Sequence, residues 1–224
     1  MSPDRREFVE RLTAGAALMA GLTLVRSDAA AAALAPAQDP TEKWDLSWAD
    51  RVSGKHRAVF DAADIEDGAG FLRAKLWKDQ YIQVLGAAPD DISVVLVVRH
   101  QAIPLVMTQA YWDRYEIGKK HKVKHPLTDK PTTFNPALLP ASELPPSLAS
   151  YTLDGFLQGG GIVLGCNLAF GEVVRTVAKG EKLAEADARK RALTMLQPGV
   201  ILQPSGVFAT IRAQEAGCHY LRAS

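Results

Sequence analysis

Cys166 stands where a reactive cysteine is expected, at the end of the apolar run 162–165 and just before a predicted helix. The amino terminus of a helix favours negative charge, so a cysteine at this position is suited to be a nucleophile or a carrier of sulfur. His100, which follows the apolar run 92–98, would stabilise the thiolate or shuttle a proton. The alternative for His100 is a hydrogen-bonded structural residue, which is the more common role of a lone histidine at a strand end. Free cysteines are also among the most buried residue types, which leaves a packed and inert Cys166 as the alternative interpretation.

Other polar side chains lie at or just past the ends of predicted strands. Ligands of parallel α/β sheets bind beyond the carboxyl ends of the strands, where side chains from several strands can converge. Ser205 also fits the N-cap position of the helix that follows it. We predict Cys166 and His100 as catalytic residues. The predicted substrate-binding residues are Asn167, Ser205 and Asp61, with Asp64 at the same edge.

The elements that must position these residues alternate between strands and helices. The run 92–98 is almost continuously β-branched, which is typical of a parallel strand buried on both faces. Apolar residues recur at helical spacing from Phe71 to Leu85, and Gly217 fits the position that ends the last helix. This alternation predicts right-handed βαβ units and a mainly parallel sheet. The predicted strands are 56–65, 92–98, 162–166, 200–202 and 219–222, and the predicted helices are 71–85, 148–158, 168–178, 183–196 and 207–216, with another after Thr108.

Residues 119–147 interrupt the alternation and are predicted to form a long loop or an inserted arm. His121 and His125 are spaced i, i+4 within this segment, as metal or haem ligands on a helix would be. Four lysines surround them, however, and Pro126 ends any helix at this point, so a solvated basic loop is the favoured interpretation. We predict no metal and no cofactor.

The amino terminus has the order of an export signal. Arg5 and Arg6 precede an uncharged apolar run, 12–25, and an alanine tract follows at 29–33. Paired arginines before such a run are typical of a twin-arginine signal peptide, here predicted over 1–33. The run is too short for a membrane anchor, the alternative, because a spanning helix needs roughly 20 residues. We therefore expect the twin-arginine translocase as a partner during export and the periplasm as the destination.

A linker with docking tryptophans, Trp44 and Trp48, is predicted over 34–54, and one α/β domain over 55–224.

Within 224 residues, 26 Lys and Arg nearly balance 25 Asp and Glu, which leaves no electrostatic case for nucleic-acid binding. Two cysteines exclude a disulfide-rich scaffold and a four-cysteine zinc site. Cys166 ends one predicted strand and Cys218 begins another, so a parallel sheet would hold them too far apart for a disulfide.

Several segments together resemble the DsrE/DsrF-like (YchN-like) family. They are IVLGCN at 162–167, LQPGV at 196–200, QPSGV at 203–207, RAQEAG at 212–217 and YL at 220–221. The resemblance is good over 150–224 and weaker over 56–110. It implies a three-layer α/β/α domain with a mainly parallel sheet of about five strands, assembled as a homo-oligomer, often a trimer or hexamer.

The resemblance also implies that sulfur is carried as a cysteine persulfide. Cys166 matches the strand-end cysteine of the family, and His100 matches the histidine that often closes its second strand. The chain departs from the pattern at Gln101 and Asn167, where the family usually has glycine, and in the larger arm at 119–147.

These observations predict an exported protein that binds or relays sulfur on Cys166 in periplasmic sulfur and thiol chemistry, with a sulfur donor or acceptor protein as partner. The alternative is a non-catalytic oligomeric binding or accessory protein of unknown ligand. A third and weaker hypothesis is metal or haem binding through His100 and Cys166.

Overall fold

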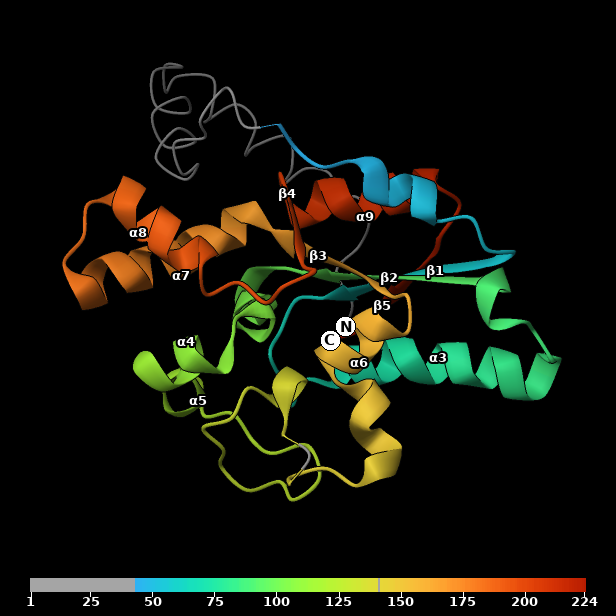
Figure 1. The fold of residues 1–224 in the computed structure, drawn as a ribbon, viewed down its shortest axis with the longest axis horizontal. Coiled ribbons are helices and arrows are strands. Elements are labelled where there is room, and N and C mark those ends of the chain that lie inside the picture. Colours follow the sequence, from blue (N-terminus) through green and yellow to red (C-terminus); the bar gives the residue numbers. More distant parts are fainter. Residues whose placement is uncertain (1–42, 141) are drawn as a thin grey trace, which may run out of the picture. The chain divides into compact units, whose positions relative to one another are not determined.

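The computed structural model describes residues 43–140 and 142–224, so the predicted signal at 1–33 and the start of the predicted linker lie outside it. The described chain contains one parallel sheet of five strands in the order β4-β3-β2-β1-β5. Helices cover both faces of this sheet, which confirms the predicted three-layer α/β/α architecture (Figure 1). The strands are β1 (His56–Ala62), β2 (Ile92–Val98), β3 (Ile162–Cys166), β4 (Ile201–Gln203) and β5 (His219–Arg222).

Two sets of helices form the outer layers. The α-helices are α3 (Ala69–Leu85), α4 (Gln109–Arg114), α5 (Ile117–Lys120), α6 (Leu153–Gln158), α7 (Asn167–Glu181), α8 (Glu185–Leu193) and α9 (Gly206–Glu215). The 3-10 helices are η1 (Ser47–Arg51), η2 (Pro89–Asp91), η3 (His100–Val106), η4 (Pro136–Leu138) and η5 (Pro146–Tyr151). Helix α9 and η1 lie against one face of the sheet, and α3 and α6 lie on the other (Figure 1).

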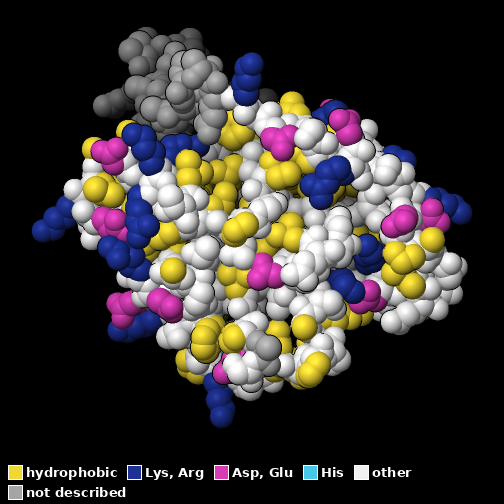
Figure 2. Space-filling model, viewed as in Figure 1, with side chains coloured by type: hydrophobic (Ala, Val, Ile, Leu, Met, Phe, Trp, Pro, Cys, Tyr) yellow, Lys and Arg dark blue, Asp and Glu magenta, His cyan; other side chains and the backbone are white. Residues whose placement is uncertain are grey.

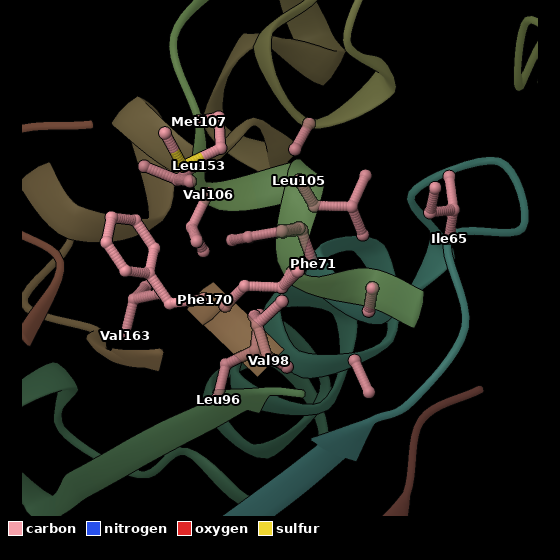
Figure 3. Packing of buried hydrophobic residues seen from close by; sticks show 14 of the residues in the cluster. Ile65, Phe71, Leu96, Val98, Leu105, Val106, Met107, Leu153, Val163 and Phe170 are labelled. Atoms are coloured by element: carbon pink, nitrogen blue, oxygen red, sulfur yellow. The ribbon is translucent and has the colours of Figure 1, made fainter. Parts of the chain in front are cut away.

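The core is divided between the two faces because side chains alternate along each strand. Leu96 and Val98 of β2 belong to the larger cluster, where they pack with Phe71 of α3 and Phe170 of α7 (Figure 3). Val95 and Val97 of β2 face the other way, into the smaller cluster beneath α9. Every residue of β2 is buried, as its almost continuous run of β-branched residues predicts.

Part of the predicted linker belongs to this smaller cluster. Trp48 in η1 is fully buried against the sheet, with Val59 and Val97 in the same cluster, whereas Trp44 is only half-buried. Large aromatic side chains remove much apolar surface from water. Residues 47–52 are therefore packed as part of the domain.

Three strands, β2, β3 and β5, have the predicted bounds, while β1 ends three residues earlier than expected. The backbone amides of Ala63 and Asp64 leave the sheet to bind the Ser224 hydroxyl, at 2.8 and 2.9 Å, and the chain then turns towards α3. The expected helix 148–158 is divided into η5 and α6, because Thr152 caps α6 by accepting a hydrogen bond from the amide of Gly155. The expected helix 183–196 is the shorter α8.

The arm at 119–147 is packed more closely than a solvated loop. Its Asn135 side chain is fully buried and donates hydrogen bonds to the carbonyls of Leu105 and Met107, at 3.0 and 2.8 Å. His125 is also buried, and its Nδ1 accepts a hydrogen bond from the amide of Leu127 at 3.1 Å. The interpretation of the basic segment around His121 and His125 as solvated is therefore wrong at His125, whereas His121 is exposed as expected.

Positive and negative side chains are interspersed over the face of the molecule shown in Figure 2, in keeping with the nearly balanced charge of the chain. Across residues 43–140 and 142–224, no helix combines the length and the apolar character needed to cross a membrane.

Candidate functional site

Cys166 is both the last residue of β3 and the N-cap of α7, since the strand passes into the helix without a loop. Its sulfur atom accepts a hydrogen bond from the backbone amide of Ala169, at 3.4 Å. The amino end of α7, a helix of 15 residues, thus points at the sulfur. The side chain is buried, with 6% of its surface exposed.

Arg99 lies beside Cys166 at the carboxyl edge of the sheet. Val98 of β2 pairs with Gly165 of β3, so the residues that follow them, Arg99 and Cys166, are also neighbours. Nε and Nη2 of Arg99 donate to the two carboxylate oxygens of Asp61, at 2.7 and 2.9 Å. This hydrogen bonding raises the pKa of Arg99 against the opposing effect of burial, and the nearby Cys166 sulfur, when negative, raises it further.

Asp61 is held from a second side by Tyr220. The Tyr220 hydroxyl donates to Oδ2 of Asp61 at 3.0 Å, and Tyr220 pairs with Val59 across β5 and β1. Burial and the hydrogen bond to Asp61 raise the pKa of Tyr220, which keeps the phenol protonated as a donor. The Asp61 side chain is only 5% exposed, and both its oxygens are occupied by these two partners.

The start of α9 closes over the stem of Arg99. A Cβ atom at Gly206 would lie 2.6 Å from both Cβ and Cδ of Arg99, which is too close for either atom to stay in place. Glycine at this position therefore lets the helix approach the arginine. The preceding Ser205 caps α9, because its hydroxyl accepts a hydrogen bond from the amide of Phe208 at 3.0 Å. The prediction of an N-cap at Ser205 is confirmed.

Gln203, at the end of β4, is the register partner of Cys166. The side chain is fully buried, and its Nε2 donates to the carbonyls of Asp45 and Leu202, at 2.8 and 3.0 Å. Its Oε1 is buried, and none of the residues that the structure describes donates a hydrogen bond to it.

The remaining predicted residues are placed differently. Asn167 is buried at the start of α7, and its side-chain oxygen accepts a hydrogen bond from Nη2 of Arg189 in α8 at 2.9 Å. His100 begins η3 with a left-handed φ of 51° and an exposed side chain. In the part of the chain that the structure describes, no hydrogen bond joins the His100 side chain to Cys166.

Sequence reasoning did not select Arg99, Tyr220 or Gln203. A usable signal for Arg99 was its place directly after a fully buried strand, where a charge needs a partner. The alternation of side chains along β2 places Arg99 on the same face as Val95 and Val97, which is also the face of Asp61 and Cys166.

The second cysteine has a different environment. Cys218 precedes β5, and Cys166 and Cys218 are both free and buried. Burial raises the pKa of the Cys218 thiol to about 11, with an opposing effect from Arg57. A thiol is a poor nucleophile until it ionises, so Cys218 serves as an internal reference for Cys166.

Among the described residues, no group of three or more His, Cys, Asp or Glu side chains is arranged to hold a metal ion. Comparison with known protein families finds no family that matches the chain, and comparison with curated proteins finds no match either.

Proposed function

We propose that Cys166 binds and relays sulfur as a persulfide, in a homo-oligomeric protein exported to the periplasm. The observation that carries the proposal is the placement of Cys166 at the amino end of α7 and on the strand next to Arg99, a cation that is fixed by Asp61. The resemblance to the DsrE/DsrF-like family supports the same chemistry, and the twin-arginine pattern at the amino terminus supports export.

The proposed step is an exchange at sulfur. The Cys166 thiolate attacks the terminal sulfur of a polysulfide, a new S–S bond forms, and the neighbouring S–S bond of the polysulfide breaks. The shortened polysulfide leaves with the electron pair, so charge is conserved and no external oxidant is needed. The amino end of α7 and Arg99 place positive charge beside the sulfur that attacks and then carries the transferred atom. His100, exposed and directly after Arg99, would exchange protons with solvent at this edge.

Mass spectrometry of peptides after polysulfide treatment tests the proposal. We expect the peptide that contains Cys166 to gain the mass of one sulfur atom, and the gain to disappear in Cys166→Ser. The peptide with Cys218 should not change at neutral pH, because its thiol stays protonated. A folded protein in which Cys166 acquires no sulfur would exclude the persulfide role.

The alternative function is a non-catalytic oligomeric binding or accessory protein, and two observations favour it. Cys166 exposes only 6% of its surface, as a packed cysteine would. Val207, Phe208 and Ile211 of α9 are exposed apolar side chains near one another along the helix, which suits a contact with another protein. This alternative predicts that Cys166 resists alkylation in the native state and that Cys166→Ser retains every cellular phenotype.

A further inference from the structure

Arg99 is anchored at one side and accessible at the other. Asp61 occupies Nε and Nη2, which is the side-on arrangement of a guanidinium with a carboxylate. Within the described residues, no hydrogen bond is made by the third nitrogen, Nη1. The Arg99 side chain is 33% exposed, against 5% for Asp61, so solvent reaches part of the arginine but hardly reaches its anchor.

The anchor makes Arg99 a rigid donor. Asp61 is itself fixed by the Tyr220 hydroxyl, and the stem of Arg99 lies against Gly206. A guanidinium that is already ordered loses little conformational freedom when it binds a ligand. Without Asp61, the guanidinium of Arg99 would be mobile.

Other features of this edge also suit a negatively charged ligand. The amino ends of α7 and α9 lie there, with Cys166 as one N-cap and Ser205 as the other. Each helix amino terminus contributes a partial positive charge. Gln203, on the strand next to Cys166, adds a buried acceptor, because its Oε1 has no hydrogen-bond partner among the described residues.

We propose that Arg99 is the residue that makes Cys166 selective for anionic sulfur compounds, and that Asp61 and Tyr220 position it for this role. The inference deepens the proposed function and rests on it for the identity of the ligand as a sulfur compound. Inorganic polysulfides are anions, and a thiolate that attacks an anion meets electrostatic repulsion. A guanidinium beside the thiolate offsets that repulsion during the approach.

Paired alkylating agents measure this selectivity without any sulfur transfer. Iodoacetate carries a carboxylate, whereas iodoacetamide is neutral. In both reagents the attacking thiolate forms a bond to carbon and displaces iodide. The rates are measured for the full chain with Cys218→Ala, so that Cys166 is the remaining thiol. The ratio of the iodoacetate rate to the iodoacetamide rate isolates the effect of charge, because general loosening of the site would raise both rates together.

In Arg99→Gln we expect the ratio to fall about fivefold to tenfold, the scale of one charge-assisted contact at a partly exposed site. The ratio for Arg99→Lys should stay above that for Arg99→Gln, because lysine retains the positive charge although it lacks the paired N–H donors of the guanidinium. The matched control is Arg212→Gln, which removes the same charge from the far end of α9, where Arg212 pairs with the exposed Glu215. Its ratio should stay within about twofold of the parent.

Arg99→Gln leaves Asp61 buried without its cation, so the double variant Asp61→Asn/Arg99→Gln serves if the single variant does not fold. An unchanged ratio in a folded variant without Arg99 overturns the inference, and so does a parallel rise of both rates. The two proposals fail separately. If polysulfide loads Cys166 but the ratio is insensitive to Arg99, the selectivity is wrong and the persulfide role stands. If the ratio falls but no persulfide forms, Arg99 still selects anions and the sulfur chemistry is wrong.

Discussion

The substitution Asp61→Asn tests whether the Asp61–Arg99 pair stabilises the fold as its geometry indicates. Asn keeps the size of the side chain but removes the charge. Two charge-assisted hydrogen bonds to Arg99, at 2.7 and 2.9 Å, are lost or weakened. The Asn amide also presents a donor where Tyr220 or Arg99 now finds an acceptor.

The expected cost is about 2–3 kcal/mol of unfolding free energy. Removing one partner of a fully buried ion pair costs about 3–5 kcal/mol, because the other charge is left without compensation. Arg99 exposes a third of its side chain, so water can partly solvate the guanidinium and the cost is lower than that limit.

Urea unfolding followed by tryptophan fluorescence measures this loss as a lower midpoint at an unchanged slope. The control is Glu215→Gln, which removes an exposed carboxylate 3.2 Å from Arg212 and should cost less than about 0.5 kcal/mol. Adding Arg99→Gln to Asp61→Asn should recover part of the loss, because the buried site then contains no unpaired charge. If Asp61→Asn costs no more than Glu215→Gln, the pair is not an anchor and the reasoning about Arg99 fails.

Three further results are expected. Gly206→Ala should displace the stem of Arg99, lower the melting temperature by the equivalent of about 1–3 kcal/mol and reduce the preference of Cys166 for iodoacetate. A melting temperature and rate ratio equal to the parent would contradict the close approach. Trp48→Ala should cost about 3–5 kcal/mol in urea unfolding, and a loss below about 1 kcal/mol would mean that η1 is not part of the core. The unfolded Cys218 thiol ionises near its ordinary pKa of 9.0 and the folded one near 11, so folding stability should fall between these pH values. Over this range the parent protein should lose on the order of 2 kcal/mol more unfolding free energy than the variant Cys218→Ala. Equal pH profiles of the two proteins would refute the effect of burial.

The strands were predictable where local sequence determines the outcome. The β-branched run of β2 and the apolar run of β3 have no competing helical period, so their bounds follow from the residues alone. Gly217 takes a φ of 91° after α9, which a residue with a Cβ rarely adopts, so the end of that helix was also predictable.

The segments η1 and η3 depend on tertiary contacts instead. The sequence predicts that Trp48 docks on the domain, but nothing in 47–51 encodes the apolar face of Val59 and Val97 against which it is buried. Residues 100–106 form a 3-10 helix that contains Pro104, a residue that argues locally against an ordinary helix. In both cases packing outweighs local preference.

The candidate site was predictable in its location but not in its connections. The strand-end rule selected Asp61, Cys166 and Ser205, and it drew attention to His100 rather than to the residue before it. Which of two consecutive residues faces a site depends on the strand register, because a shift of one residue reverses the face. The sequence contains the alternation of β2 but not its register against β1 and β3, and so Arg99 was overlooked.

The register also explains why five separate strands can build one site. Gln203, Cys166, Arg99, Asp61 and Tyr220 come from β4, β3, the end of β2, β1 and β5, which is their order across the sheet. Their side chains share the face beneath α9, because side chains alternate between the two faces of the sheet and residues at matching register positions point to the same face. The hydrogen bonds of Asp61 with Arg99 and with Tyr220 each cross to a neighbouring segment of the sheet, and in the described part of the chain Asp61 is linked to the neighbourhood of Cys166 through Arg99. A change at Tyr220 must act on the thiol through the same arginine, so Tyr220→Phe should alter the alkylation ratio in the parent but not in a protein that already lacks Arg99.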